Sequence, residues 1–189
     1  MTEVVEIRAF VEDDLDRVIA FSLRTWEPVF ASLQSVLGDE IFLRLYPDWR
    51  TSQADGVRAS CTKDDLDSFI AVLDERPVGF VTIGLNAFHE RMGVIEMIGV
   101  DPDYQRRGVG AQLTTFALGH MRAAGMDIAV VETGGDPGHA PARALYGATG
   151  FTLLPIARYF QLIDSPETST KPFGAQEGHE PDANTSETA

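Results

Sequence analysis

One stretch of the chain, residues 94–111, constrains the fold most strongly because it joins an apolar strand to a helix through a glycine-containing turn. A strand is predicted over Val94–Val100, an Asp-Pro pair ends it, and a helix is predicted over Gly110–Ala124. Between them the chain reads Gln-Arg-Arg-Gly-Val-Gly. Helix N-termini and consecutive amides bind anions, and glycine lets phosphate oxygens approach the backbone. The stretch therefore predicts an α/β fold with a site for a phosphate-bearing ligand.

Two common phosphate-binding motifs do not fit this turn. A P-loop needs a lysine and a hydroxyl after its last glycine, and neither follows Gly110 at that spacing. A dinucleotide-binding fingerprint needs a third glycine where this chain has Leu113, although Glu132 imitates the ribose-binding acid of such sites. A nucleotide-binding module that only mimics the glycine motif is therefore the least favoured of three interpretations, and the other two follow from the motifs described next.

Two motifs together resemble the GNAT superfamily of N-acetyltransferases. Val-Asp-Pro followed by Gln-Arg-Arg-Gly-Val-Gly-Ala is similar to the family's loop, Gln/Arg-x-x-Gly-x-Gly/Ala, and Ala142–Phe151 is similar to its later helix, Ala-x-x-Leu-Tyr-x-x-x-Gly-Phe. The resemblance covers Ile7–Leu162. It implies a mixed α/β (α+β) fold, in which a mostly antiparallel sheet is flanked by helices and its fourth and fifth strands splay apart.

The resemblance also implies acetyl-CoA as the acyl donor and indicates where it binds. The pantetheine arm pairs with the fourth strand, here with Ile98, Gly99 and Val100. The family often has an asparagine seven residues before its tyrosine, and this chain has His139 at that position. A neutral histidine offers one donor and one acceptor to the cofactor. His139 can instead be an exposed loop residue. The pyrophosphate lies on the loop and the helix start, which comprise Gln105, Arg106, Arg107, Gly108, Val109, Gly110 and Ala111. Gln105, Arg106 and Arg107 add side-chain contacts.

The catalytic groups are carried over from the same resemblance. Tyr146 matches the tyrosine that donates a proton or a hydrogen bond to the departing sulfur, and the Val100 N–H is the expected oxyanion donor if a bulge frees it from the ladder. By strand alternation, Glu96 shares an apolar face with Val94, Ile98 and Val100, which predicts a raised pKa and a role as general base. Glu132, or a water molecule, is the alternative.

The sequence thus predicts an N-acetyltransferase that acts on the primary amine of a small molecule or peptide by direct attack in a ternary complex. A non-catalytic acetyl-CoA sensor that binds a protein partner is the runner-up. The acceptor stays open among small amines, aminoglycoside-like polyamines, amino acids and protein N-termini. Aromatic residues of the segment 22–58 either enclose a cationic amine or pack the core, and the second interpretation is favoured: Trp26, Phe30, Phe42, Tyr46 and Trp49.

Composition bounds the partners and the domain organisation. The formal net charge is −14, and the six acids and one lysine of residues 164–189 account for −5 of it, so −9 remains for residues 1–163. This balance argues against nucleic-acid binding. No run of 18 apolar residues or metal-ligand spacing is present, and the lone Cys61 fits packing in a reducing cytoplasm. We expect one acetyltransferase domain over 1–163, a disordered acidic tail over 164–189, and leave a homodimer open.

Hydrophobic periodicity predicts the remaining elements. A helix over Glu12–Trp26 is expected to end before Pro28, and a final strand is expected over Phe151–Ile163 with an interruption near Pro155. The other predicted strands are Val4–Phe10, Phe69–Asp74, Val78–Leu85 and Met126–Glu132, and the other predicted helices are Val36–Leu45, Asp55–Cys61 and Ala140–Thr149.

Overall fold

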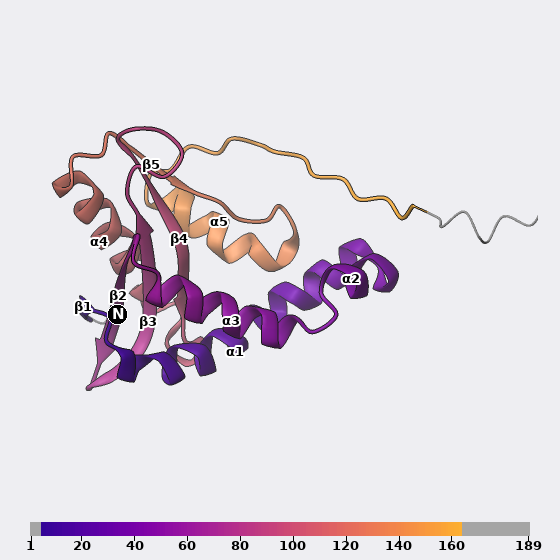
Figure 1. Ribbon diagram of the computed structural model, residues 1–189, viewed down its shortest axis with the longest axis horizontal. Coiled ribbons are helices and arrows are strands. Elements are labelled where there is room, and N and C mark those ends of the chain that lie inside the picture. Colours follow the sequence, from indigo (N-terminus) through magenta and orange to yellow (C-terminus); the bar gives the residue numbers. More distant parts are fainter. Residues whose placement is uncertain (1–4, 164–189) are drawn as a thin grey trace, which may run out of the picture.

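Five strands form one mixed sheet at the centre of the molecule, in the spatial order β1-β2-β3-β4-β5 (Figure 1). The computed structural model describes residues 5–163. Neighbours from β1 to β4 are antiparallel, and β4 and β5 are parallel. The predicted mixed, mostly antiparallel sheet is therefore confirmed. Its strands are β1 (Glu6–Ala9), β2 (Leu66–Leu73), β3 (Arg76–Gly84), β4 (Met92–Val100) and β5 (Ile128–Val131).

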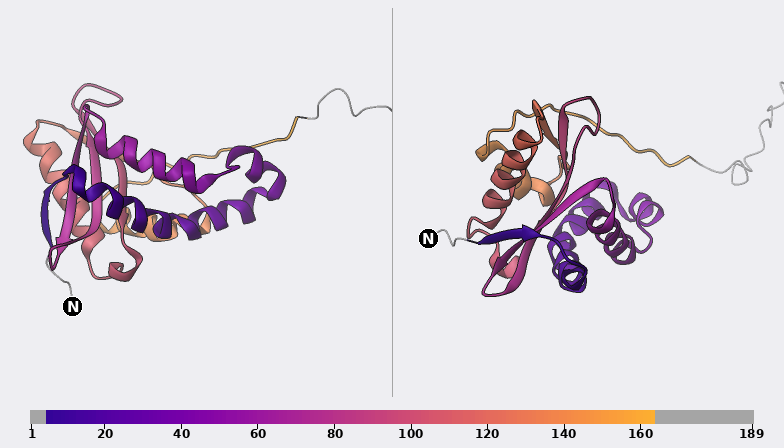
Figure 2. Two further views of the ribbon diagram at one scale, coloured as in Figure 1. Left: turned by 60° about the horizontal axis from the view of Figure 1, so that its bottom comes forward. Right: turned by 60° about the vertical axis from the view of Figure 1, so that its left-hand side comes forward.

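Helices cover both faces of this sheet, which Figure 2 shows from two further directions. On one face lie α1 (Leu15–Leu37), α2 (Asp39–Leu45) and α3 (Trp49–Thr62), and on the other lie α4 (Val109–Ala123) and α5 (Ala140–Ala148). The core on the α1/α3 side includes Phe21, Val57 and Phe80, and the core on the α4 side includes Val81 and Leu113. Because β3 is central, nearly all of its residues are buried. Three short 3₁₀ helices complete the described chain: η1 (Glu12–Asp14), η2 (Pro102–Tyr104) and η3 (Pro137–His139).

Helix α1 passes through Pro28, so the prediction that this proline ends the helix is wrong. A proline inside a helix removes one hydrogen bond and costs about 3 kcal/mol. Burial of Phe21 before the proline and Phe30 after it offsets that cost, because each side chain packs against other elements. The helix ends instead at Gly38, whose φ of 75° also separates α1 from α2 and divides the helix predicted across this point.

Aromatic side chains hold α1, α2 and α3 together. Phe30 stacks on Trp49 with ring centroids 4.4 Å apart and meets the edge of Tyr46 at 5.4 Å. Phe42 lies 5.4 Å from Tyr46. Trp26 instead reaches the sheet, with its ring 6.5 Å from that of Phe80. These contacts agree with the packing interpretation of the aromatic residues.

The chain after α5 differs from the prediction. Residues 151–163 have no regular secondary structure, so the predicted final strand is wrong for this chain taken singly. Figure 1 shows the segment running out beyond α2. The acidic tail predicted for 164–189 lies outside the described residues. Cys61 is buried, and burial raises the pKa of its thiol to about 12, as suits a packing residue. Among the helices of residues 5–163, none has both the length and the apolar character needed to cross a bilayer.

Candidate functional site

A β-bulge in β4 opens the sheet beside the glycine-containing turn. The pairing of β3 with β4 shifts between Thr82 and Ile83, so Glu96 is an extra residue on β4. Pairing of β4 with β5 ends at the adjacent position, where Ile95 lies opposite Val131. A bulge bends its strand and increases the local twist. The C-terminal half of β4 therefore parts from β5 and presents an unpaired edge.

Hydrogen-bond alternation decides which main-chain groups this open edge carries. The Asp101 amide donates to the Val78 carbonyl at 2.9 Å, which continues the β3–β4 ladder one residue past the strand. Because bonded positions alternate in an antiparallel pair, the main-chain groups of Gly99 face β3. Those of Ile98 and Val100 face the open edge. Of the three residues expected to pair with pantetheine, two are thus oriented for it.

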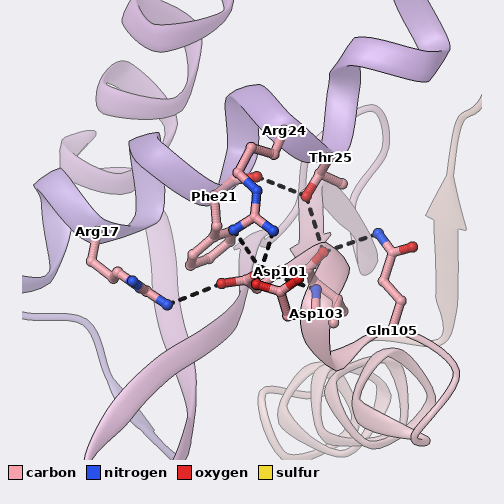
Figure 3. Close-up of polar contacts among 8 residues, drawn as sticks. Arg17, Phe21, Arg24, Thr25, Asp101, Asp103 and Gln105 are labelled. Carbon is pink, nitrogen blue, oxygen red and sulfur yellow. Dashed lines mark hydrogen bonds and ion pairs between the residues drawn. The ribbon is translucent and has the colours of Figure 1, made fainter.

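The Val100 carbonyl is held by two side chains (Figure 3). The Thr25 hydroxyl lies 3.0 Å from this carbonyl and 2.9 Å from that of Phe21, and the Gln105 side-chain amide donates to it at 3.1 Å. Gln105 was expected on the pyrophosphate, and in the structure its side-chain amide contacts the end of β4. Its position here fixes the strand end and leaves the N–H of Val100, on the preceding peptide, facing the open edge.

A buried carboxylate fastens α1 to the same strand end. Asp101 is fully buried, and its oxygens lie 3.1 Å from the guanidinium of Arg17 and 3.2 Å from that of Arg24. Both arginines come from α1, as Figure 3 shows, and Arg24 also pairs with the exposed Asp103 at 2.9 Å. Asp101 further accepts a hydrogen bond from the Asp103 amide at 3.1 Å. Sequence reasoning missed this cluster, because its acid and arginines are far apart along the chain.

The turn after β4 leads into a helix N-terminus that carries no side-chain cap. Arg106 and Gly108 both have left-handed backbone, with φ of 59° and 89°. Gly108 occupies the N-cap position, and the Gln112 amide donates to its carbonyl at 3.1 Å as a helical bond of the first turn. The preceding amides of α4, at Val109, Gly110 and Ala111, therefore point out of the helix end with the positive pole of its dipole.

The surroundings of this helix end also suit an anion. Arg106 and Arg107 are exposed, and the Arg107 guanidinium lies over the Tyr104 ring, 5.1 Å from its centroid. A surface hollow of about 490 Å³ runs along the first two turns of α4. Its lining residues are Gly108, Ala111, Gln112, Thr115 and Phe116. Positive charge lies at the turn before α4, and the hollow begins at Gly108 and extends along α4; the diphosphate site at this corner stays a prediction.

Tyr146 provides a protonated phenol on α5. Its side chain is buried, and its ring meets the edge of Phe151 with centroids 5.8 Å apart. Burial raises the pKa of Tyr146 to about 12. The phenol therefore keeps its proton throughout the neutral range and can donate a hydrogen bond or a proton.

Glu96 has a different environment from the one predicted. The expectation that it shares a face with Ile98 and Val100 is wrong, because the bulge shifts the side-chain alternation by one residue. Ile95, Ile98 and Val100 all pack on the α4 side of the sheet, and Glu96 is exposed. Glu132, which follows β5 directly, is exposed as well. Both carboxylates lie where β4 and β5 stop pairing, and neither is enclosed by apolar side chains.

A cluster that joins α1 to the loop before α5 was not anticipated. Asp136 accepts hydrogen bonds from the Ser32 hydroxyl at 2.7 Å and from the Gly138 amide at 3.0 Å, and its other oxygen contacts Nδ1 of His139. A Cβ at Gly138 would lie 2.9 Å from the backbone of α1, so only glycine allows this close approach. The run Gly-Gly-Asp-Pro-Gly was the available signal, and its partner Ser32 was not identifiable from the sequence.

The ionised carboxylate of Asp136 favours the His139 tautomer that carries its proton on Nδ1. Burial raises the pKa of this carboxyl, but the hydrogen bonds from Ser32 and His139 outweigh burial, and the pKa lies below its ordinary value. An ionised carboxylate accepts the Nδ1–H of His139. In the tautomer that donates from Nδ1 to Asp136, the lone pair is on Nε2, which is then free to accept a hydrogen bond.

Comparisons with known proteins agree with this geometry. The sequence model of the family described as "Acetyltransferase (GNAT) family" matches residues 35–151, more than half of the chain. Mycothiol acetyltransferase of Streptomyces bingchenggensis is 36% identical over 84 residues, which cover 44% of this chain and 26% of that protein. Mycothiol acetyltransferase of Actinosynnema mirum is 32% identical over 111 residues, covering 57% and 36%. The chain thus spans about a quarter to a third of the length of these curated relatives.

Solved structures share the fold. An aminoglycoside acetyltransferase from an uncultured soil metagenomic sample, in complex with trehalose, superposes with a TM-score of 0.55 at 20% identity, over 85% of this chain and 97% of that one. The PaiA N-acetyltransferase of Thermoplasma acidophilum, in complex with coenzyme A, superposes with a TM-score of 0.60 at 16% identity, over 82% and 94%. At these identities the likeness concerns the fold.

Proposed function

Because the chain belongs to the GNAT acetyltransferase family, we propose that it is an N-acetyltransferase that moves an acetyl group from acetyl-CoA to a primary amine in a ternary complex. The observation that carries the proposal is the combination at the end of β4. A bulge parts β4 from β5, and the uncapped N-terminus of α4 lies directly after the same strand. A thioester-bearing arm and its diphosphate need these two features next to each other.

Acetyl-CoA would bind along this corner. The amides of Val109, Gly110 and Ala111 would hold the diphosphate, with Arg106 and Arg107 adding charge from the turn. The pantetheine amides would pair with the outward main-chain groups of Ile98 on β4. The Val100 carbonyl already accepts from Thr25 and Gln105, and the Val100 N–H would remain available to the thioester carbonyl. The acetyl thioester would then lie between β4 and α5.

The reaction needs one group for each of its charge changes. The neutral amine attacks the thioester carbonyl, a C–N bond forms, and the C–S bond breaks. The Val100 N–H would stabilise the oxyanion of the tetrahedral intermediate. Tyr146 would donate a hydrogen bond or its proton to the departing thiolate, and its raised pKa keeps the phenol protonated at neutral pH for that role.

Two groups are candidates for the base that takes the ammonium proton. Glu96 lies at the bulge and is exposed, so it can reach the amine directly or through water. His139 presents Nε2 while Asp136 holds Nδ1, an arrangement typical of an oriented base. Parallel pH profiles of kcat/KM for Glu96→Gln and His139→Gln distinguish them, because loss of the base removes the acid limb of the profile.

The acceptor class we propose is a small-molecule or peptide amine. The curated relatives are named mycothiol acetyltransferases and a structural neighbour is named an aminoglycoside acetyltransferase, and both names support a small molecule. The net charge of −14 favours approach of a cation. The buried thiol of Cys61 forms no disulfide within the described residues, which suits a cytoplasmic enzyme.

A panel of amines tested for release of free CoA decides the proposal. We expect turnover with at least one primary amine, and Tyr146→Phe should lower kcat roughly 10²-fold while acetyl-CoA binding is unchanged. Tyr159→Phe is the matched control, because that phenol is 91% exposed whereas Tyr146 is buried. Tight binding of acetyl-CoA without release of CoA from any amine would favour the sensor interpretation instead.

A further inference from the structure

Helix α1 contacts both the end of β4 and the loop that joins β5 to α5. Its Thr25 hydroxyl donates to the Val100 carbonyl at 3.0 Å, and its Ser32 hydroxyl donates to Asp136 at 2.7 Å. Thr25 and Ser32 are seven residues apart, which is two helical turns, so they lie on one face of α1 about 10 Å apart along its axis. Helix α1 is therefore the element that joins the strand end to the loop that carries His139.

The loop is fitted closely to α1 at Ser32. A Cβ on Gly138 would lie 2.7 Å from the Cβ of Ser32 and 2.9 Å from the Cα of Val29. The Gly138 amide donates both to the Ser32 hydroxyl oxygen, at 2.9 Å, and to the Asp136 carboxylate, at 3.0 Å. From α5, the Arg143 guanidinium donates to the main-chain carbonyl of Asp136 at 2.8 Å. Asp136 is thus held by α1, by its own loop and by α5, which leaves its side chain little freedom to turn.

The hydrogen bonds of Asp136 decide which ring nitrogen of His139 is the donor. Oδ2 of the carboxylate accepts from the Ser32 hydroxyl and the Gly138 amide, and Oδ1 contacts Nδ1 of His139. Although burial raises the pKa of this carboxyl, the bonds from Ser32 and His139 keep it below its ordinary value, so the carboxylate has no proton to give. Nδ1 is then the donor and Nε2 the acceptor. The side chains of Asp136 and His139 are 6% and 21% exposed, so a bound reactant can still reach the imidazole.

We propose that Ser32 and Asp136 are positioning residues that fix His139 with its lone pair on Nε2, and that Nε2 takes the proton of the acceptor ammonium. The inference rests on the proposed function and selects His139 over Glu96 as the base, because a buried carboxylate orients the imidazole whereas Glu96 is exposed. The proton moves from the ammonium nitrogen to Nε2, and the freed lone pair of the amine attacks the thioester carbon. The imidazolium keeps its Nδ1–H on Asp136 and releases the Nε2 proton to water after the products leave.

NMR of the histidine ring nitrogens tests the positioning without turnover. On the alkaline plateau of a pH titration we expect the ring proton of His139 on Nδ1, and the spectrum of His139→Gln identifies its signal among the four histidines. In Asp136→Asn the amide oxygen stays on the Ser32 and Gly138 donors, so the NH₂ group faces Nδ1 and the ring proton should move to Nε2. A wild-type ring proton on Nε2, or the same tautomer in both proteins, would overturn the proposal.

A double-mutant cycle measures whether Ser32 acts through Asp136. With an amine that the wild type acetylates, Ser32→Ala should lower kcat roughly tenfold and Asp136→Asn roughly 10²-fold, while the KM for acetyl-CoA is unchanged. The double variant should be no slower than Asp136→Asn, because the serine acts only through the carboxylate. Additive losses would mean that Ser32 acts by another route and would overturn the proposal. Ser35→Ala is the matched control, because Ser35 is an exposed serine of the same helix and its loss should leave kcat unchanged.

Failure of this proposal differs measurably from failure of acetyl transfer. If Asp136→Asn raises the KM for acetyl-CoA and leaves kcat unchanged, His139 contacts the cofactor and its role as base is overturned. If the wild type acetylates no amine, the proposed function fails, and the ring-nitrogen spectra still decide whether Ser32 and Asp136 position the imidazole. If Asp136→Asn does not fold, Ser32→Ala carries the test: it should lower the fraction of the Nδ1–H tautomer, and a wild-type tautomer together with a wild-type kcat would overturn the proposal.

Discussion

Replacing Asp101 with asparagine tests how strongly α1 is fastened to the end of β4. Asparagine has nearly the same shape and still accepts from the Asp103 amide at Oδ1, but its NH₂ group replaces the oxygen that faces Arg17, and its neutral amide lacks the charge that pairs with both guanidiniums. A hydrogen bond to a charged group contributes about 1.5–3 kcal/mol when its partner is buried. The side chains of Arg17 and Arg24 are 47% and 48% exposed, so water solvates them when the acid is lost.

We therefore expect Asp101→Asn to lower the free energy of unfolding by about 2–3 kcal/mol, below the full cost of breaking a buried pair. For a chain of this length that corresponds to a fall in Tm of roughly 5–10 °C. Differential scanning calorimetry measures the change. The KM for acetyl-CoA should rise in parallel, because the strand end that carries the Val100 N–H loses its support.

The matched control is Asp103→Asn. Asp103 also pairs with Arg24, at 2.9 Å, but its side chain is 68% exposed. Exposed ion pairs contribute about 0–1 kcal/mol, so the control should shift Tm by no more than about 3 °C. If both variants shift Tm equally, burial is not what makes the Asp101 contacts strong, and the reasoning is refuted.

Two further predictions concern the glycine turn and the ion pair between Arg8 and Asp14, whose nearest atoms are 2.7 Å apart. Gly108→Ala should weaken acetyl-CoA binding and cost about 1 kcal/mol of stability, because the φ of Gly108 is 89°. In the control Gly119→Ala, the added Cβ within α4 meets no neighbour, so this variant should be neutral or stabilising. Calorimetry that ranks the two variants alike would contradict this. Hydrogen bonds from Arg8 hold the pKa of Asp14 below its ordinary value. The stabilisation of the fold by the ionised Asp14 is therefore present above about pH 4 and is lost as pH falls through the pKa of the folded state. Urea unfolding should show a stability deficit in Asp14→Asn at pH 7 that shrinks by pH 3, and a deficit that persists there would contradict the assignment.

Elements that depend on local pattern were predictable from the sequence. The turn at residues 105–108, the helix that follows it and the strands on either side lie where apolar spacing and glycine positions indicated. The end of α1 at Pro28 and the final strand over residues 151–163 were predicted incorrectly for opposite reasons. Tertiary burial around Phe21 and Phe30 overrides the helix-breaking tendency of the proline. Residues 151–163 have a strand-forming sequence but no strand beside them in the single chain.

Contacts between distant segments were not predictable. Arg17 and Asp101 are 84 residues apart, and Ser32 and Asp136 are 104 residues apart. No spacing rule joins such pairs, since they meet only because α1 crosses both the end of β4 and the loop before α5. The bulge at Glu96 belongs to the same class, because the residue that becomes extra depends on how β3 and β4 fit their opposing helices.

By itself, the sequence determined which residues we propose for the chemistry. The two glycines and the neighbouring arginines follow from local order, because backbone conformation and helix ends depend on nearby residues, and Tyr146 follows from the resemblance to the family. Only the tertiary structure decided how these groups are presented. It selected Ile98 and Val100 as the outward-facing main chain, and it exposed Glu96 rather than enclosing it. The reason is physical: register and burial depend on the packing of the whole sheet, and a shift of one residue turns a side chain to the other face.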